Sequence, residues 1–501
     1  MTDTEIVLVH VIMERHFGVY PAAVSKILLE TGEMPLKELY RRTSQHSPRI
    51  PSKAVKESLQ LFSQHNLLLL HVYPELVEDG PYLSFDVSRA FFFLIEPSMC
   101  YAVEELFGDE AARAVALLLG MGTTPAEDFM AEFEQDGKAS RSISEKIVFE
   151  LLRARVFTAL DVAMKYDSDD REVGVEMVVR KPQWSKYALQ INVSRLFVVF
   201  ILYLTQSKVE NDPALGPVGL EVFLGLCRAS LLCAPLRTNF ICEDLFLPVT
   251  ATDVLNNVPE NSQEGMETHV VEANLDGIAN LIDGFLDNSD KHYTLRGTKL
   301  LGMWAEHFVY EILRADLPHV PMARPVMQFL TRNSKPYVQA KALEMELYGN
   351  SHAMRYAIND LCRLGFVDTM GTSHVASFEP GRTEIFLHVN LPRLYRQKLQ
   401  FDYCENVLRC TTAMETRLAK DAAARRFGLA SSSSQAAQGA GGDGEVVQQK
   451  FEKMEMGFTD ALAFSLLYTR AVSSITAEDG CREAFSLVDF FSRNPIPDEQ
   501  A

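Results

Sequence analysis

The sequence SKAVKESLQLFSQHNLLLLHVYPELVEDGPYLSFDV, residues 52–87, decides the fold of the N-terminal part of this chain. Its first half places Val55, Leu59 and Phe62 on one face of a helix. Its second half holds two β-like runs around the turn Glu-Asp-Gly-Pro at residues 78–81. A helix followed directly by a β-hairpin is the C-terminal half of a winged helix, which is a variant of the helix-turn-helix.

The residues upstream predict the remaining helices of the same unit. Pro21 and Pro35 can each open a helix, because proline fits the first helical turn, and Ser52 can cap the helix that follows. An earlier helix is indicated by apolar residues at helical spacing, namely Ile6, Val9, Met13 and Phe17. Together with the hairpin, these helices predict a winged helix.

The same order of elements recurs along the chain. We therefore predict a mainly α fold with small β wings, made of four tandem extended winged helices over residues 1–90, 91–182, 183–297 and 298–390. The repeat is one of architecture, because we see no residue-level period. The third unit is the least regular of the four.

Two details of the middle units are open to a structural check. In the second unit we expect helices from Pro97 onward and a wing with strands at 156–162 and 173–179, around an aspartate-rich turn. An extended segment at 187–193 then opens the third unit.

The character of the sequence changes after residue 390. Residues 392–427 predict one long amphipathic helix, and residues 446–491 predict another. Between them, residues 429–445 are rich in Ser, Gly and Ala, which is typical of a flexible linker. We therefore expect residues 391–501 to form a helical hairpin or coiled coil. Its apolar stripe must pack on its own partner helix or on another subunit.

Composition limits the function further. The chain has 501 residues, enough for several domains, and a formal net charge of -19. Such acidity argues against a protein that finds nucleic acid by itself, because backbone binding depends on positive charge, although it leaves room for a local basic surface. The longest apolar run, 196–204, is too short to cross a membrane, and the acidic N-terminus carries no secretory signal, so we expect no membrane role.

No catalytic motif emerges from the sequence. The glycines 439, 441 and 444 match a dinucleotide fingerprint in spacing, but they lie in the predicted linker with no strand before them. The histidines are dispersed, and neither a nucleophile elbow nor a phosphate-binding loop is present. We therefore expect a non-catalytic chain with no cofactor, no metal and no small-molecule substrate.

The positive signal is a basic stretch in the first unit, between residues 34 and 56. Six cations stand there against the single carboxylate of Glu38: Lys37, Arg41, Arg42, Arg49, Lys53 and Lys56. In a helix-turn-helix this part of the chain faces a duplex. The stretch fits three descriptions: an ordinary solvated surface, a contact with DNA or RNA, or a contact with an acidic protein.

A second candidate contact lies in the fourth unit. His352 and Arg355 are on its third predicted helix, and Arg382 precedes its last strand. Solvated surface positions would also explain these three residues.

Five stretches of the chain resemble a known family. One contains His16-Phe17-Gly18 at the end of the first helix, and another contains Gln64-His65-Asn66-Leu67 before the first wing. The others are Tyr187–Phe197, Ala357–Val367 and Pro380–Asn390. In their order along the chain, these stretches resemble the third-largest subunit of RNA polymerase III, a family related to the winged-helix initiation factor TFIIE.

The resemblance implies a specific role. It implies a nuclear subunit of a peripheral heterotrimer that acts in transcription initiation, where it positions and helps to open promoter DNA. Its partners would be the other RNA polymerase III subunits, in the heterotrimer and the core, promoter DNA, and the initiation factor TFIIIB. The family offers no catalytic residues to transfer. The alternative is a winged-helix scaffold of another assembly that binds only proteins.

Overall fold

The computed structural model describes residues 3–71, 81–137, 140–161, 184–210, 215–232, 246, 248–258, 266–281, 285–332, 337–347, 351–373 and 383–395. Contacts divide them into two compact units, which meet at Gly297 and Thr298 and are considered separately. Arg382, the strand expected at 173–179 and the hairpin expected beyond residue 395 lie outside the described residues.

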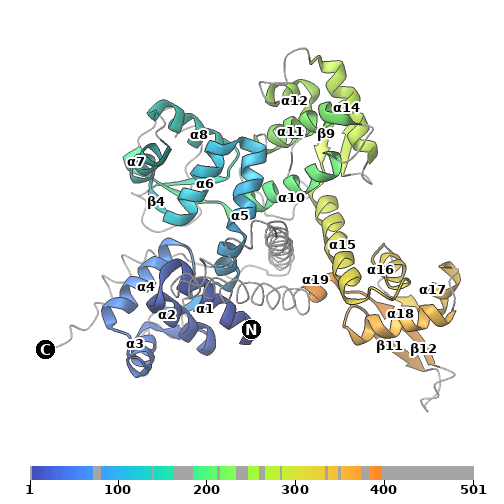
Figure 1. Cartoon of the computed structure of the whole chain (residues 1–501), viewed down its shortest axis with the longest axis horizontal. Helices are drawn as coiled ribbons and strands as arrows, with labels where there is room; N and C mark the ends of the chain where they lie inside the picture. Colours follow the sequence, from blue (N-terminus) through green and yellow to red (C-terminus); the bar gives the residue numbers. More distant parts are fainter. Residues whose placement is uncertain are drawn as a thin grey trace, which may run out of the picture. The chain divides into compact units, whose positions relative to one another are not determined.

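The first compact unit contains three modules with a common order of elements: two helices, a short strand, two helices and two strands (Figure 1). The first module consists of α1 (Asp3–Phe17), α2 (Val19–Thr31), β1 (Met34–Pro35), α3 (Leu36–Gln45), α4 (Ser52–Gln64), β2 (Leu68–His71) and β3 (Tyr82–Phe85).

The second module begins at Val87. It consists of α5 (Val87–Phe107), α6 (Asp109–Met121), β4 (Thr124–Pro125), α7 (Ala126–Gly137), α8 (Arg141–Arg153), β5 (Phe157–Asp161), the 3₁₀ turn η2 (Trp184–Lys186) and β6 (Tyr187–Ile191). The third module consists of α10 (Val193–Glu210), α11 (Gly216–Leu232), β7 (Val249–Thr250), α12 (Ala251–Asn257), α14 (Thr268–Leu281), β8 (Leu286–Ser289) and β9 (His292–Leu295).

The second compact unit holds the fourth module, which repeats the same order. It consists of α15 (Gly297–Asp316), α16 (Ala323–Arg332), β10 (Val338–Gln339), α17 (Ala340–Glu346), α18 (Ser351–Arg363), β11 (Asp368–Ser373), β12 (Thr383–His388) and α19 (Leu391–Leu394). Tyr395 then donates its hydroxyl to the carbonyl of Ala305, which ties the end of the described chain to α15 at 2.5 Å.

Each module has one antiparallel sheet of three strands, with the last strand in the middle: β1-β3-β2, β4-β6-β5, β7-β9-β8 and β10-β12-β11. A mainly helical chain with small antiparallel sheets is what the sequence predicted, and it is consistent with winged helices. No helix among the described residues is long and apolar enough to span a bilayer.

The core of the first module confirms the helical spacing of the opening stretch. Val55, Leu59 and Phe62 are completely buried on α4, Leu83 and Phe85 of β3 are buried too, and the Phe85 ring meets the Phe62 ring edge-on at 5.2 Å. The alternation in β3 thus directs apolar side chains inward, while Tyr82 and Ser84 face out.

One backbone hydrogen bond recurs at the end of three modules. The residue after the last strand donates its amide to the carbonyl of the residue that directly precedes the second strand. These pairs are Asp86 to Leu67 at 2.8 Å, Asn192 to Val156 at 2.9 Å and Arg296 to Phe285 at 2.7 Å. These three modules therefore share more than their order of elements, since the same bond extends the pairing of the second and last strands by one position.

Two of these junctions also share a sequence, which we call a joint: Asp86-Val87-Ser88-Arg89 and Asn192-Val193-Ser194-Arg195. The carboxylate of Asp86 accepts the Arg89 amide at 3.2 Å, and the side chain of Asn192 accepts the Arg195 amide at 3.0 Å, so both cap the next helix. The two copies of this four-residue motif do not make a period, but they show that the two junctions are alike in sequence as well as in hydrogen bonding.

Three expectations about local structure need correction. Pro51, not Ser52, is the residue before α4, and it caps the helix without a side-chain hydrogen bond. The helix expected from Pro97 starts at Val87 instead, and Pro97 lies inside it. The segment assigned to the start of the third unit, Tyr187–Ile191, pairs with β4 and β5 in the second sheet.

Candidate nucleic-acid interface

The outer face of α4 carries part of the predicted basic stretch. Lys53 and Gln60 are exposed and Lys56 is half-buried, on the side opposite Val55, Leu59 and the other core residues. Lys53 approaches Glu57 at 3.8 Å, but both side chains are largely exposed, so the pair contributes little. A row of lysine and glutamine at helical spacing offers donors to phosphates and to base edges.

The arginines of α3 are arranged differently, because both contact Glu38. Arg41 donates to the two carboxylate oxygens at 2.6 and 2.7 Å, and Arg42 donates to one of them at 2.7 Å. These hydrogen bonds lower the pKa of Glu38 to about 2, so the carboxylate stays ionised and offsets the local charge. The sequence identified all three residues but not this arrangement, which depends on side-chain conformation.

The two remaining cations of the stretch are exposed: Lys37 on α3 and Arg49 before α4. Within the described residues, Lys37 has no ion pair or hydrogen bond. The six predicted residues thus lie on α3, on the turn and on α4, and among them Arg41 and Arg42 contact Glu38 while Lys53 approaches Glu57.

The C-terminal end of α4 is held by the second module. Gln64 donates its side-chain amide to the Met121 carbonyl at 2.7 Å, and its own carbonyl accepts the Thr123 amide at 2.7 Å. Between them, Gly122 has a φ of +72°, and a Cβ at this position would stand 2.7 Å from the Gln64 carbonyl oxygen. Only glycine allows this approach.

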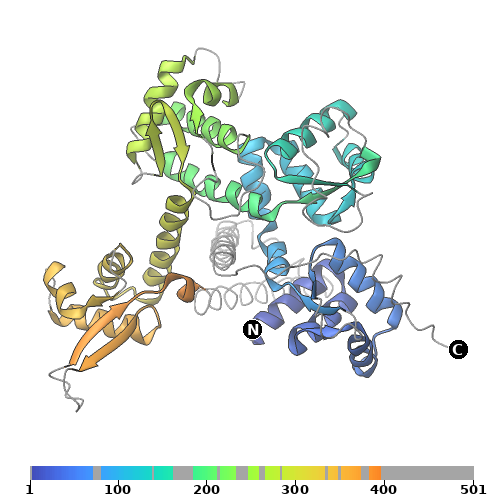
Figure 2. The ribbon, with the colours of Figure 1, turned by 180° about the vertical axis from the view of Figure 1, so that it is seen from behind.

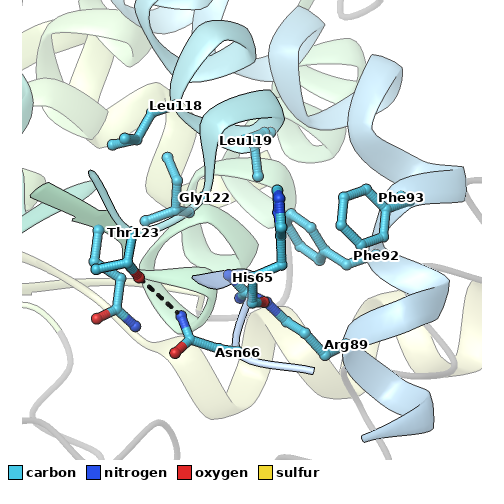
Figure 3. Close-up of a pocket in the computed structure, with 11 residues that line it drawn as sticks. His65, Asn66, Arg89, Phe92, Phe93, Leu118, Leu119, Gly122 and Thr123 are labelled. Atoms are coloured by element: carbon cyan, nitrogen blue, oxygen red, sulfur yellow. Dashed lines mark hydrogen bonds between the residues drawn. The ribbon is translucent and has the colours of Figure 1, made fainter. Parts of the chain in front are cut away.

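Aromatic rings line the other side of this contact. The His65 ring lies 4.8 Å from Phe17 and 5.8 Å from Phe93, centroid to centroid, and Arg89 donates to the His65 carbonyl at 3.2 Å. Figure 3 shows His65, Arg89 and Phe93 around a small cavity that also reaches Gly122. The cavity has room for about one water molecule, which makes it too small for a substrate.

The electrostatics of the cavity keep His65 neutral. Burial, with repulsion from Arg89 and His16, lowers the pKa of His65 to about 4. Burial and Arg15 also lower the pKa of His16. The contact between the first two modules therefore combines aromatic rings and a neutral imidazole with the Arg89 guanidinium, and it lies at the other end of α4 from Lys53 and Lys56.

The fourth module presents a second polar face, on α18. His352, Arg355, Tyr356 and Asn359 are all exposed there, and they recur at helical spacing on one side. Tyr356 is 69% exposed, although an aromatic ring is usually buried. The sequence analysis named His352 and Arg355 but missed Tyr356, since it searched for charge, and the helical spacing from His352 was the signal that could have found it.

Comparison with known proteins adds a family to this geometry. Residues 7–73 match the model of the RNA polymerase III subunit RPC82 helix-turn-helix domain. The match spans most of the first module. The matched range covers the whole basic stretch, α4 and β2.

Two curated proteins support the same assignment. The chain is 30% identical over 145 residues to "DNA-directed RNA polymerase III subunit RPC3" of Mus musculus, and equally to the protein of that name from Rattus norvegicus. The match covers 28% of this chain and 26% of each relative, so it spans about a quarter of their length. The predicted resemblance to this subunit of RNA polymerase III is confirmed.

Proposed function

We propose that this chain is a non-catalytic subunit of RNA polymerase III that acts in transcription initiation in the nucleus. Its four modules are tandem winged helices, and residues 391–501 form the helical hairpin expected from the sequence. It works beside the other subunits of a peripheral heterotrimer and the core, contacts the initiation factor TFIIIB, and positions and helps to open promoter DNA. The match of the first module and the names of the two relatives support this proposal.

The observation that carries the DNA contact is the outer face of α4. Lys53, Lys56 and Gln60 stand on the fourth helix of the first module, the helix that enters the major groove in a helix-turn-helix. The opposite end of the helix is anchored by Gln64, so the face is presented on a fixed support. Lys37 and Arg49 extend it toward neighbouring phosphates.

The face of α18 is the second contact. His352 and Arg355 supply donors to phosphates, and Tyr356 supplies an exposed ring that can stack on an unpaired base. A duplex-binding face and a face that includes a stacking residue suit a chain that works where promoter DNA opens.

The net charge explains why these faces act within an assembly. At -19, the whole chain repels a polyanion, and Glu38 offsets the two arginines of α3. Binding therefore depends on the polymerase, which brings the DNA close. The purified chain alone should bind duplex DNA weakly at physiological salt.

The test has two steps. Affinity purification from nuclear extract should first recover the RNA polymerase III core subunits in near-equal amounts. In the purified assembly, Lys53→Glu with Lys56→Glu should then lower crosslinking of the first module to promoter DNA on the order of tenfold, because two phosphate contacts become repulsive.

A matched control is available in Lys186→Glu with Lys291→Glu. Both of these lysines are exposed and lie in other modules, so this pair makes the same change in charge away from α4. If the two double variants crosslink equally, the DNA contact is not made by α4. A chain that still co-purifies with the polymerase would then be a protein-binding scaffold.

A further inference from the structure

The wing of the fourth module differs from the others in length. β11 and β12 pair over six positions, from Asp368 with His388 to Ser373 with Thr383. The corresponding pairs in the other modules have four, five and four positions. Figure 2 shows this ribbon, in orange, extending past the helices of its own module.

β11 is an edge strand. In the described chain it pairs on one side only, with β12, because the sheet order is β10-β12-β11. Its free side therefore carries backbone donors and acceptors that a further strand can use.

The part of β11 whose exposure is described, Asp368–Met370, is exposed on both faces. Asp368, Thr369 and Met370 are consecutive and all exposed, although consecutive side chains in a strand point to opposite faces. Met370 is 46% exposed on one face, and Ile385 of β12 is 48% exposed on the other. Natural edge strands are usually guarded by lysine, proline or a bulge, but the sequence Asp-Thr-Met-Gly-Thr-Ser contains neither lysine nor proline.

A glycine adds a specific feature to this edge. Gly371 is paired with Ile385, so no side chain separates the exposed Ile385 from whatever lies beside β11. Glycine inside a strand often marks a close approach by another chain, and a large side chain on a neighbouring strand can cover it. At Gly371, next to Met370 along the strand, the edge therefore leaves the apolar side chain of Ile385 accessible from the side of β11.

From these observations we infer that β11 binds an extended segment of a partner protein, which adds to the sheet as a fourth strand. The segment carries a large apolar side chain over Gly371, an apolar one beside Met370 and a basic one beside Asp368. The backbone donors and acceptors on the outer side of β11 would be satisfied by another extended segment, so the occupant is a strand. Asp368, the one charged residue of β11, favours a basic segment over nucleic acid, and a net charge of -19 opposes a second copy of the chain.

This inference goes beyond the proposed function, because it requires neither DNA nor the polymerase. The probe is the acetylated, amidated peptide Thr-Val-Phe-Val-Thr-Lys, which in antiparallel register sets Phe beside Gly371, Val beside Met370 and Lys beside Asp368. The control peptide has Pro in place of the second Val, which removes a backbone donor. Both are mixed with the full-length chain, and amide hydrogen exchange is measured over residues 368–373.

At saturating probe, exchange of the β11 amides should slow on the order of tenfold, while the control peptide leaves it unchanged. Met370→Lys should abolish this protection and Met370→Leu should keep it. Both variants should keep the thermal unfolding midpoint of the natural chain, because Met370 is half exposed.

Three outcomes would overturn the inference. One is the absence of protection by the probe, and another is equal protection by both peptides. The third is protection of β11 in the peptide-free chain that grows with chain concentration, with a dimer in sedimentation that Met370→Lys removes. That result would assign the edge to a second copy of the chain.

Discussion

The two joints have the same sequence ending, Val-Ser-Arg, yet their arginines lie in different surroundings. Arg195 is buried and donates to two carbonyls, those of Ala154 at 2.9 Å and Leu231 at 2.6 Å. Arg89 is half-buried and donates to the His65 carbonyl beside the small cavity. In both cases the arginine reaches back to the residue at the end of the preceding module's fourth helix. The motif is therefore associated with a hydrogen bond from its arginine to the carbonyl at the end of the fourth helix. The burial of the arginine differs between the joints, and with it the free energy of unfolding that depends on this bond.

Burial has a cost at the second joint. It lowers the pKa of Arg195 to about 10, with a smaller contribution from repulsion by Arg155. The arginine remains charged at neutral pH, so its two carbonyl partners must replace the water that it lost. At the first joint the titrating group is His65 instead, and its neutral form is the one that fits. The second joint thus requires a charged Arg195, whereas the first joint requires a neutral His65.

The largest expected effect is a difference in the free energy of unfolding between substitutions of the two joint arginines. Arg195→Ala should lower the free energy of unfolding of the second module by about 3–5 kcal/mol, because two buried carbonyls lose their donors. Arg89→Ala should cost only about 1–2 kcal/mol, since one half-exposed bond is lost. Urea unfolding followed by the fluorescence of Trp184, in a Trp304→Phe background, reports on the second module alone. Equal losses from the two substitutions would contradict the difference in burial.

The next effect tests the close approach at the first joint. Gly122→Ala should destabilise by about 2–4 kcal/mol, because the new Cβ meets the Gln64 carbonyl and φ is positive. Gly120→Ala is the matched control: no atom lies within 4 Å of its Cβ position on α6, so helix propensity should make it neutral or slightly stabilising. The Trp184 assay applies again. A Gly122→Ala loss no larger than the control's would mean that the modules do not hold this contact in solution.

A pH titration should affect the first joint more than the second. The folded-state pKa of His65 is about 4, below its ordinary 6.5, so the unfolded chain binds the proton first as the pH falls. Stability should be complete above pH 6.5 and be lost between pH 6.5 and 4, by up to about 3 kcal/mol. His16 shifts in the same direction.

The control for this titration is His65→Gln, which removes the titrating group. The variant should be less stable at neutral pH but should show a shallower loss over the same pH range. If its slope matches that of the natural chain, the loss arises elsewhere.

The smallest expected effect concerns the second residue after the fourth helix in the first two modules. Arg155 has a φ of +60° and Asn66 a φ of +56°. Arginine is strained there, whereas asparagine tolerates this conformation, and Asn66 also contacts the Thr123 hydroxyl at 3.4 Å. Arg155→Gly should therefore stabilise by about 1 kcal/mol and Asn66→Gly should be close to neutral. Stabilisation of the same size at both sites, in the Trp184 assay, would count against a local origin.

The sequence predicted those features that depend on near neighbours. The inward face of α4 follows from the spacing of Val55, Leu59 and Phe62, because a helix brings such residues together by itself. The basic stretch was visible as composition. The contacts of Glu38 with Arg41 and Arg42 were not, because which carboxylate oxygen each arginine contacts is set by side-chain conformation.

The missed features depend on partners far along the chain. β6 pairs with β5 across residues 162–183, and the alternating pattern at 173–179 offered a nearer partner for the same strand. Arg89 reaches His65 in another module, and periodicity within one element carries no information about that bond. Both errors have the same physical origin, which is that local patterns cannot rank contacts between distant segments.

The joints also imply where such a chain can be divided. A fragment that stops at the last strand of the first module, at Phe85, loses the donor for its own His65 carbonyl, because that donor is Arg89. A segment that keeps both the cap of α5 and the arginine donor to the Ala154 carbonyl runs from Asp86 to Arg195, and it is displaced by several residues from the segment that folds around one core. Gene fragments and protease cuts that respect this displacement keep the arginine that donates to the carbonyl at the end of the fourth helix, whereas those made at the last strand leave that carbonyl without its donor.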